Sequence, residues 1–525
     1  MSPKRISPEF KQPKTKIVKI KILLARLALL VSTFNSPLST AHAQGALTPP
    51  GVPAPTMKTL AQIEPRTPIS SAPYTISASG SYYLTTNVTV SSGDAITIAT
   101  NGVTLDLNGF TIRSTAASAA GNGILINSGL RNLTILNGFI QGGVTNNGSG
   151  VYAGSGFAYG IAYGGNQPVN VLVSKVFVSG CLTYGIFLNT GDATVVEGCT
   201  ARTIGDHGIY ASTVKSCVAA DCGNTAIFGD QVSDCRGAST GSATGIFATA
   251  TALNCYGSAS FSGTGLYANT AQNCYGFSIG SGTGLDANTA QNCYGSASGS
   301  GTGLNATTAQ NCSGYSTGNG IGLSATATAQ NCSGYSVSGS GIAIYAGGTL
   351  IGCRGNSSNT GISCGDHCTV KDCTANYNST NGIVVGQSCR ISGCTVGSNG
   401  TGSTGVGITA GIRTTIESCT VNNNRGDGIL TVGGDCTIRD NHASNNGLGG
   451  SGSGIHTTGS GSRIDGNQTR DNANYGIKSD GGAGADTITR NTSGGNGTAA
   501  YTPTTGATFA PVQTPATSTS PWANF

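Results

Sequence analysis

A seven-residue phrase occurs five times between Thr251 and Gly334, once as TALNCYG, twice as TAQNCYG and twice as TAQNCSG. Its cysteines stand 19 or 20 residues apart, and the segments between the copies repeat as well. A short fixed period in a sequence rich in Gly, Thr, Ala and Asn, with no helical pattern, is typical of a β-solenoid. We therefore expect each repeat to form one coil that contacts only the coils before and after it.

The period extends beyond these copies, because a Gly-Ile or Gly-Leu pair recurs at steps of 18 to 26 residues. Side chains alternate across a strand, so the Ile or Leu of each pair should face the interior and stack on its equivalents. Burying each of them contributes roughly 1.5–3 kcal/mol before the entropy of ordering is subtracted. The expected core column is Ile186, Ile209, Ile227, Ile246, Leu266, Leu285, Leu304, Leu323, Ile342, Ile362, Ile383, Ile408, Ile429, Ile455 and Ile477.

A second column consists mainly of cysteine. Equivalent Cβ atoms of adjacent coils lie parallel and about 4.8 Å apart, whereas a disulfide needs roughly 3.8 Å and converging bonds. Although 18 cysteines in an exported chain would favour disulfides, we expect buried thiols that act as small apolar side chains. The column is Cys181, Cys199, Cys217, Cys235, Cys255, Cys274, Cys293, Cys312, Cys332, Cys353, Cys373, Cys394 and Cys419, followed by Asn441, Asn467 and Asn491.

With this stack of turn residues, positions 75–495 resemble the right-handed parallel β-helix family, the pectate-lyase-like superfamily with its NosD-like repeats. The segments IEPRTPISSAPYTI, VTLDLNGFTI and PWANF also look like secreted bacterial β-helix proteins of unassigned activity. The resemblance implies an all-β solenoid, for which the marked repeats predict about 15 to 19 coils. It also implies that any catalysis would be carbohydrate chemistry on one long face, with carboxylates, Arg or Lys as base, or calcium held by Asp.

The first 43 residues have the pattern of a secretory signal peptide. A basic segment precedes the apolar run Leu27-Ala-Leu-Leu-Val31, and Ala41 and Ala43 form an A-x-A cleavage pattern before Gln44. We expect a mature chain that is secreted or held at the cell surface. A membrane anchor is the alternative, but this apolar run is too short to span a bilayer and directly follows Arg26.

The segments flanking the repeats have a different composition. Residues 44–74 contain a proline cluster and a short helical pattern, which predict a linker and a cap over the first coil. Residues 496–525 are rich in Gly, Thr and Pro and predict a flexible tail. Trp522, the only tryptophan, lies in this tail, where it could serve in docking or sorting or as an apolar cap.

The overall charge of +5 suggests nucleic acid at first, but its distribution argues against that partner. Eight of the 26 basic residues and one of the 21 acidic residues lie in the first 26 positions. The remaining chain has 18 basic and 20 acidic side chains and a net charge of −2. We therefore predict no nucleic-acid binding and no cofactor, and expect a polysaccharide or cell-envelope surface as the partner.

The residue after each core Ile or Leu should face solvent, and in five consecutive coils it is aromatic. Rings repeated at the coil spacing suit the apolar faces of successive sugar residues. The alternative is structural packing, either of the rings on one another or beneath the segment 151–165. The aromatic positions are Phe187, Tyr210, Phe228, Phe247 and Tyr267, and the column continues as Asp286, Asn305, Ser324, Ala343 and Ser363.

Candidate catalytic residues gather near the carboxyl end, at Asp427, His456, Tyr475, Lys478 and Asp480. His or Lys could remove a C5 proton from a uronic acid while Tyr protonates the leaving oxygen, as a lyase or epimerase requires. An ordinary polar surface is the alternative. The sequence Asp206-His207 resembles part of a polygalacturonase motif, but the accompanying motifs are missing.

Two further site types find weak support. Cys364, Asp366, His367, Cys368 and Cys373 could ligate a soft metal, but their spacing matches no strong motif and we predict no metal site. Regular hydroxyl arrays can order ice-like water, although threonine is common on any exposed sheet. The threonine columns are Thr244, Thr264, Thr283 and Thr302, and Thr251, Thr270, Thr289, Thr308 and Thr328.

The sequence therefore predicts an exported parallel β-helix that is a non-enzymatic structural or polysaccharide-binding protein. Evenly repeated, weakly charged coils without family catalytic motifs favour that interpretation. The alternative is a polysaccharide lyase, epimerase or hydrolase that acts on a glycan containing uronic acid.

Overall fold

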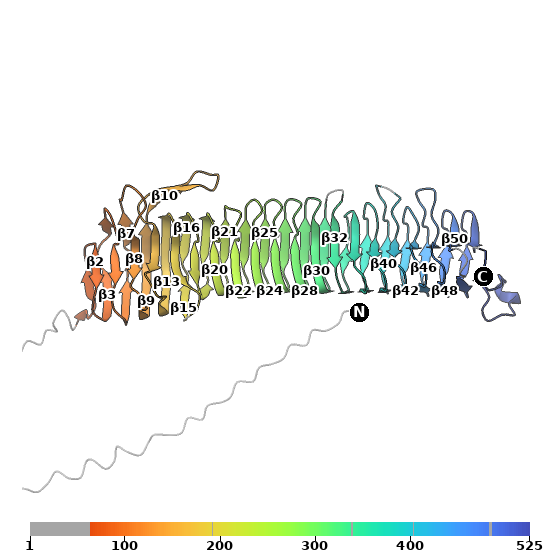
Figure 1. Ribbon diagram of the computed structural model, residues 1–525, viewed down its shortest axis with the longest axis horizontal. Helices are drawn as coiled ribbons and strands as arrows, with labels where there is room; N and C mark the ends of the chain where they lie inside the picture. Colours follow the sequence, from red (N-terminus) through yellow and green to blue (C-terminus); the bar gives the residue numbers. More distant parts are fainter. Residues whose placement is uncertain (1–62, 192, 338–339, 403, 482–485, 504) are drawn as a thin grey trace, which may run out of the picture. The chain divides into compact units, whose positions relative to one another are not determined.

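Parallel pairing between successive coils joins 52 strands into one sheet that winds around the long axis (Figure 1). The computed structural model describes residues 63–191, 193–337, 340–402, 404–481, 486–503 and 505–525. Within it, Glu64–Phe525 forms a right-handed parallel β-helix of about 20 coils. The predicted fold class is confirmed.

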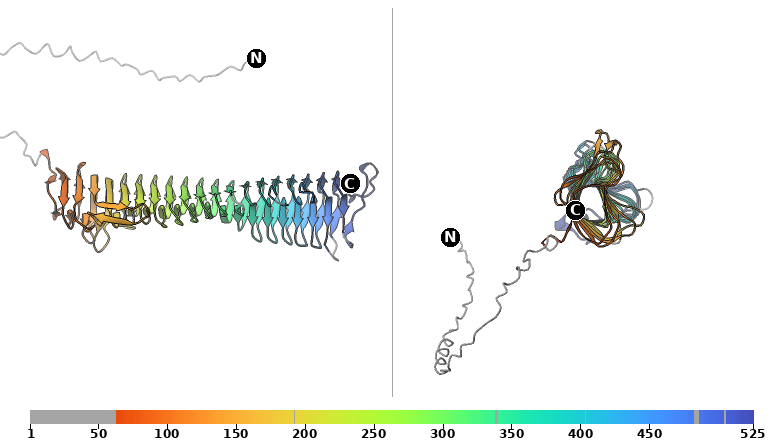
Figure 2. Two further views of the ribbon diagram at one scale, coloured as in Figure 1. Left: turned by 90° about the horizontal axis from the view of Figure 1, so that it is seen from above. Right: turned by 90° about the vertical axis from the view of Figure 1, so that its left-hand side faces the viewer.

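Each coil has three faces, which enclose a narrow interior when the rod is viewed along its axis (Figure 2). In one coil, β38 (Ile383–Val385) lies on the first face, β39 (Arg390–Ser392) on the second and β40 (Thr395–Gly397) on the third. In the sequence repeats, one bent strand covers the first and second faces and a short strand covers the third. The bent strands are β22 (Ile246–Leu253), β24 (Leu266–Gln272), β26 (Leu285–Gln291), β28 (Leu304–Gln310) and β30 (Ile321–Gln330), and the short ones are β23 (Tyr256–Ala259), β25 (Tyr275–Ser278), β27 (Tyr294–Ala297), β29 (Ser313–Ser316) and β31 (Ser333–Ser336).

The predicted core column is present on the first face, with one member misplaced. Leu323 pairs with Ile344, which pairs in turn with Ile362, so Ile344 rather than Ile342 occupies the column. The segment Ile342-Ala-Ile344 offers two inward candidates at strand spacing, and pairing selects the second. Ala343 is consequently buried, and Tyr345 occupies the outward position that we assigned to Ala343.

All 18 cysteines are buried and unbridged. In the turn from the second to the third face, the Cys293 thiol donates to the Ala271 carbonyl of the preceding coil at 3.4 Å. In a later coil, the Asn467 amide donates to the equivalent Ile438 carbonyl at 2.8 Å. Cysteine therefore occupies the same hydrogen-bonding position as the turn asparagine.

The cysteine column begins later and the asparagine column ends later than we predicted. The Val176 N–H lies 3.4 Å from the Cys199 sulfur, whereas Cys181 pairs with Ile204 on the third face. Cys181 is therefore not a member of this column. At the other end, the column gains Asn524, whose side-chain oxygen accepts from the Asn491 N–H at 3.0 Å.

A second asparagine column, not predicted from the sequence, lies in the turn that leaves the third face. The Asn446 amide donates to the Asn472 side chain and to the Val421 carbonyl, both at 3.0 Å. The preceding residue has a left-handed conformation, as at Asn445 with φ 53°. The members are Asn378, Asn399, Asn424, Asn446, Asn472 and Asn496.

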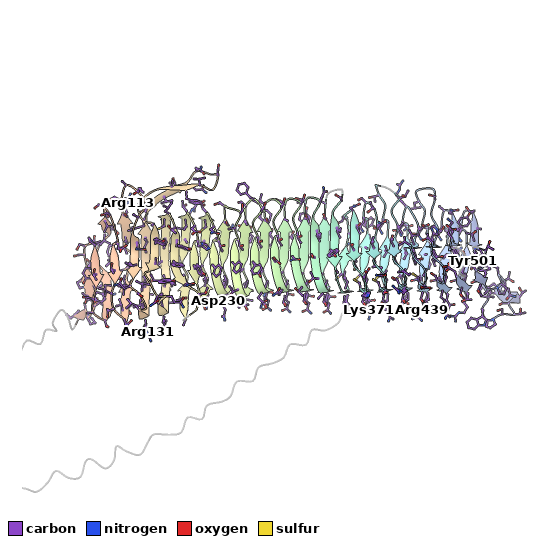
Figure 3. The ribbon with its side chains drawn as sticks, in the orientation of Figure 1. Arg113, Arg131, Asp230, Lys371, Arg439 and Tyr501 are labelled. Carbon is purple, nitrogen blue, oxygen red and sulfur yellow. The ribbon has the colours of Figure 1, made fainter. Side chains whose placement is uncertain are left out.

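Residues 496–525, which we expected to form a flexible tail, are folded in the described part of the chain. Strand β53 (Ala499–Thr502) pairs with β50 (Tyr475–Ser479), and β54 (Thr508–Phe509) pairs with β51 (Thr487–Thr489). A 3-10 turn, η1 (Pro515–Thr517), follows. The Tyr501 hydroxyl, near the end of the rod (Figure 3), lies 2.9 and 2.8 Å from the Asn491 and Phe525 carbonyl oxygens, which share its one hydrogen. Trp522 lies beside Arg490, and the segment closes the carboxyl end.

At the amino end, pairing begins with β1 (Thr67–Ile69), which lies before the predicted start of the β-helix at residue 75. The predicted signal peptide and nearly all of the proposed helical cap lie outside the described residues. The described part of the chain has no helix long and apolar enough to cross a membrane.

Replacing Asn446 with Ala should lower the free energy of unfolding by roughly 3 kcal/mol, because the Asn424 N–H and the Val421 carbonyl lose their partner in the interior. Thermal and urea unfolding followed by circular dichroism measure the change. Gln310→Ala, at an exposed position in the repeats, is the matched control and should change stability by less than about 0.5 kcal/mol. Equal effects of the two substitutions would contradict the role of the amide column.

A thiol-specific reagent should react slowly with the native protein and with all 18 cysteines after denaturation without reductant. The cysteines are inaccessible when folded, and burial raises the pKa of Cys181 to about 12. Absorbance of the released thiol measures the reaction. Fewer reactive thiols after denaturation, with two hydrogens lost in the intact mass per missing pair, would show disulfides instead.

Candidate functional site

The five predicted aromatic residues align in one row, here called the first-face stripe: Phe187, Tyr210, Phe228, Phe247 and Tyr267. Consecutive ring centroids lie 5.5, 4.4, 4.9 and 4.6 Å apart; the first pair meets edge to face, the second pair is tilted, and the last two pairs are stacked. The first four rings are half-buried, and Tyr267 is 36% exposed. Strand pairing places these residues in five successive coils, so the row runs along the rod.

The segment 151–165, which we considered as a cover for these rings, takes another position. Its first part belongs to the hairpin of β10 (Gly143–Asn146) and β11 (Tyr152–Ser155), which extends along one edge of the rod in Figure 1. The Tyr152 hydroxyl bonds the Asp221 carboxylate at 2.8 Å, beside the third face. Its second part is β12 (Tyr159–Tyr163), itself a first-face strand, whose Tyr163 ring stacks on Phe187 at 5.0 Å.

The first-face stripe continues into a polar column toward the carboxyl end. Tyr267 pairs with Asp286, which pairs with Asn305 in the following coil. The Asn305 amide donates to the Asp286 carboxylate at 2.9 Å. Stacked rings beside amide and carboxylate groups offer both an apolar surface and hydrogen-bonding partners.

Four of the five candidate catalytic residues come together on adjacent coils, and Tyr475 is the exception. His456 Nδ1 lies 2.9 Å from an Asp427 oxygen, and His456 Nε2 lies 3.0 Å from Asp480. Lys478 Nζ lies 2.5 Å from the same Asp480 oxygen. A cavity of about 190 Å³ is lined by Asp427, His456 and Lys478. Tyr475 lies on β50 but is not among the residues that line the cavity.

The charges of this cluster are already compensated. Burial lowers the pKa of His456, but its hydrogen bonds and the charge of Asp427 outweigh that effect, so the net shift is upward. Burial likewise opposes ionisation of Asp480, while Lys478 and His456 outweigh it and lower the carboxyl pKa. Because both imidazole nitrogens bond carboxylates, His456 has no free nitrogen for a substrate proton in this arrangement.

The other candidate groups are dispersed or enclosed. His207 bonds Asp206 at 2.8 Å and stacks on Tyr184 and Tyr210 beside the first-face stripe. Cys368 is buried, and its N–H lies 3.3 Å from the Cys389 sulfur. Among the residues that the structure describes, no group of three or more His, Cys, Asp or Glu side chains is placed to hold a metal ion.

Comparison with known proteins gives a family model for part of the sequence and a few distant structural similarities. A family model described as a right-handed β-helix region matches residues 349–493. No curated protein matches the chain.

Among solved structures, the chain is similar to two A-modules of mannuronan C-5 epimerases from Azotobacter vinelandii. For AlgE4 the identity is 14%, over 71% of this chain and 87% of that one, with a TM-score of 0.18. For AlgE6 it is 13%, over 83% and 92%, with a TM-score of 0.18. The catalytic domain of a GH87 α-1,3-glucanase has 13% identity, over 83% of this chain and 62% of its own length, with a TM-score of 0.13. At these values the similarities carry no argument about activity.

Replacing His456 with Gln should destabilise the protein by about 1 kcal/mol at low pH and by much less at high pH. A histidine whose pKa is raised on folding contributes stability below its unfolded value of about 6.5, and this contribution disappears as the pH rises through the folded pKa. Urea unfolding at about pH 5 and pH 9 measures the difference. An imidazole that titrates below the ordinary value by NMR would contradict the contacts with Asp427 and Asp480.

Proposed function

We propose that this protein is an exported, non-enzymatic solenoid that binds a polysaccharide along its first face. The observation that supports this most is the row of five aromatic rings in successive coils, with centroids 4.4–5.5 Å apart. Coils repeat at roughly 4.8 Å, close to the length of one sugar residue in an extended chain. A glycan parallel to the axis can therefore place one sugar residue against each coil of the row.

The chemistry of the row fits sugars better than it fits a protein partner. Sugar rings present apolar C–H faces, which pack on aromatic faces, and hydroxyls, which need donors and acceptors nearby. Asp286 and Asn305 supply those groups in the same column. Tyrosine hydroxyls at Tyr210 and Tyr267 add further partners within the row.

The alternative, a lyase, epimerase or hydrolase for a uronic-acid glycan, requires an available base or a pair of acids at one bond. In the carboxyl-terminal cluster His456 is bound on both sides by carboxylates, and Lys478 is bound to Asp480. In the polar column that continues the first-face stripe, the Asp286 carboxylate is bonded to Asn305. We therefore favour binding without turnover.

The double substitution Phe247→Ser and Tyr267→Asn should weaken retention by immobilised polysaccharide at least about fivefold, because two stacked rings are lost from the face. Affinity electrophoresis through a panel of neutral and acidic polysaccharides measures retention. Later coils carry Asn305 and Ser324 at this position, so the substitutions use side chains that the column already accommodates.

The melting curve of this variant should stay close to that of the native chain. Unchanged retention with an unchanged melting curve would contradict binding by the first-face stripe, and a large loss of stability would identify the rings as packing. Unsaturated products detected by ultraviolet absorbance during the same incubations would support the enzymatic alternative.

A further inference from the structure

We infer that the carboxyl end of the rod is an interaction surface for a second copy of this chain, and that residues 511–525, here called the plug, keep this surface closed. Each coil presents backbone donors and acceptors that the following coil satisfies. At the carboxyl end β53 pairs with β50 and β54 pairs with β51. Among the residues that the structure describes, no named strand follows β52 (Thr492–Gly494) on the third face, and the plug takes that place.

The last residues of the plug bond the third face as a further strand would. The Phe525 N–H donates to the Asn491 carbonyl at 2.7 Å, and the Phe525 carbonyl oxygen accepts from the Ser493 N–H at 2.6 Å. The two bonds have the pattern of parallel strand pairing. The Trp522 carbonyl oxygen accepts from the Arg490 N–H at 3.2 Å. The plug therefore satisfies backbone groups that would otherwise be unpaired at the end of the last coil.

Asn524 anchors the plug and is fully buried. Its side-chain oxygen accepts from the Asn491 N–H and amide at 3.0 and 3.3 Å, and its amide donates to the Ile488 and Ala510 carbonyls at 3.1 and 2.9 Å. Both lone pairs and both hydrogens of the amide are therefore in use. An aspartate of the same shape could accept in this place but could not donate to either carbonyl.

The remainder of the plug, residues 512–521, is a loop whose hydrogen bonds stay within the plug. The Gln513 side-chain oxygen accepts from the Thr519 and Ser520 N–H groups at 3.2 and 3.4 Å. In the part of the chain that the structure describes, the hydrogen bonds between the plug and the coils run through residues 522–525. Because the attachment is one short stretch, the plug can leave the coils as a unit.

The end that the plug covers is uncharged. From Asn491 to Phe525 the sequence contains no Asp, Glu, Lys, Arg or His. Natural proteins protect strand edges with charged side chains, with proline or with a covering segment. Pro511, Pro515 and Pro521 all belong to the plug, so its departure removes these prolines together with the cover.

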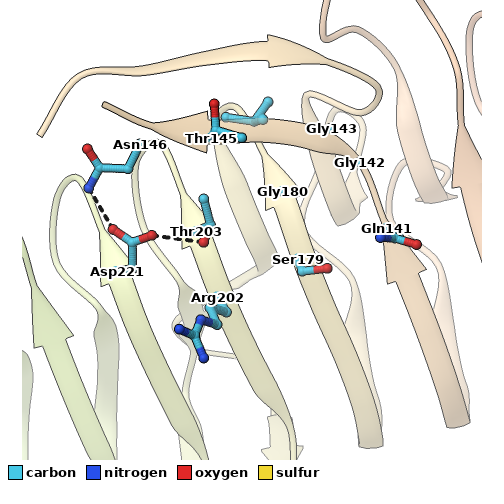
Figure 4. A pocket seen from close by; sticks show the side chains of 11 residues that line it. Gln141, Gly142, Gly143, Thr145, Asn146, Ser179, Gly180, Arg202, Thr203 and Asp221 are labelled. Carbon is cyan, nitrogen blue, oxygen red and sulfur yellow. Dashed lines mark hydrogen bonds between the residues drawn. The ribbon is translucent and has the colours of Figure 1, made fainter. Parts of the chain in front are cut away.

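The β10–β11 hairpin also extends from the coils, but it is fastened to a charged group. The Asp221 carboxylate accepts from the Asn146 amide at 2.7 Å and from the Thr203 hydroxyl at 2.8 Å, as Figure 4 shows from close by. Hydrogen bonds to an ionised group are stronger than those between neutral groups, and all the groups that hold the plug in place are neutral. Of these two segments, the plug is therefore the one that opens more easily.

Opening the plug exposes unpaired backbone groups of Arg490, Asn491 and Ser493 beside the uncharged strands β53 and β54. A second opened end presents the same groups, and neither end carries a charge in this segment that would repel the other. Two identical ends can pair edge to edge about a two-fold axis, an arrangement that closes at a dimer. A second copy of this chain is therefore the partner that fits.

The test uses the full-length chain with the substitution Asn524→Asp, which removes both donor bonds of the anchor. In sedimentation velocity, the average mass of the variant should rise with concentration to about twice that of the native chain at the same concentration. An excess of a peptide with the sequence of residues 511–525 should restore the native value, because its asparagine fills the vacated site.

The matched control is Asn269→Asp, the same chemical change at an exposed position of a central coil. There the side-chain oxygen accepts from the Asn288 amide, which an aspartate can also do. This variant should sediment like the native chain, with and without the peptide.

Hydrogen exchange of the native chain measures the opening without any substitution. The N–H groups of Asn491 and Asn467 are a matched pair, because each donates to the side-chain oxygen of the next asparagine in the column, at 3.0 and 2.9 Å. The protection factor of Asn491 should be on the order of tenfold lower than that of Asn467, since the partner of Asn491 belongs to the plug. Ser493 and Phe525 should share the lower value.

The expected result is association of the Asn524→Asp variant that the peptide reverses, together with lower protection at Asn491 than at Asn467. A variant that sediments like the native chain, association that the peptide does not reverse, or equal protection at the two positions would overturn the inference. A variant without the native circular dichroism would also overturn it, because the segment would then be part of the fold and not a plug. None of these measurements involves a glycan, so they are independent of the proposed function.

Discussion

The structure depends on one recurring demand at the turn between the second and third faces, where an inward side chain must bond the backbone of the coils around it. Asn467 meets that demand with its amide, which donates to the Ile438 carbonyl while its oxygen accepts from the Asn441 N–H. Cys293 meets it with a thiol whose one hydrogen is shared between the Ala271 carbonyl of the preceding coil and the Gln291 carbonyl of its own coil. Sulfur is the weaker partner, but it fills the interior with an apolar atom.

From Cys199 onward these bonds tie each coil to its neighbours, and strand pairing carries the register to the outer surface. Because equivalent residues pair directly, a side chain chosen once per coil becomes a row along the axis. The first-face stripe arises in this way, from residues 18 to 23 positions apart in the sequence. It requires no pocket built from a folded loop.

A repeated sequence mark made the first-face stripe predictable, whereas the outward residues of the third face have no such mark. Phe187, Tyr210 and Phe228 follow a visible Gly-Ile or Ala-Ile mark, so the outward position could be counted. Phe139, Phe177, Val218 and Arg236 differ in type and follow no common mark, so only the pairing of strands aligns them. We chose Ile342 over Ile344 because Ile342 follows the Gly mark. The two isoleucines stand two positions apart and both fit an inward position, so only strand pairing identifies Ile344 as the core residue. We did not predict that Asn524 belongs to the column, because 33 residues separate it from Asn491. That spacing is longer than any between successive members of the expected core column.

The uniform pairing of the central coils affects how the number of coils can change during evolution. From β24 to β28, Leu266, Leu285 and Leu304 pair in turn, and the accompanying Thr, Ala and Gln positions pair without a register shift. A unit of 19 residues that is duplicated or deleted here leaves the neighbours with the same partners they have now. The length of the molecule, and the distance between its two ends, can therefore evolve in whole coils by recombination between nearly identical stretches, while both ends remain unaltered.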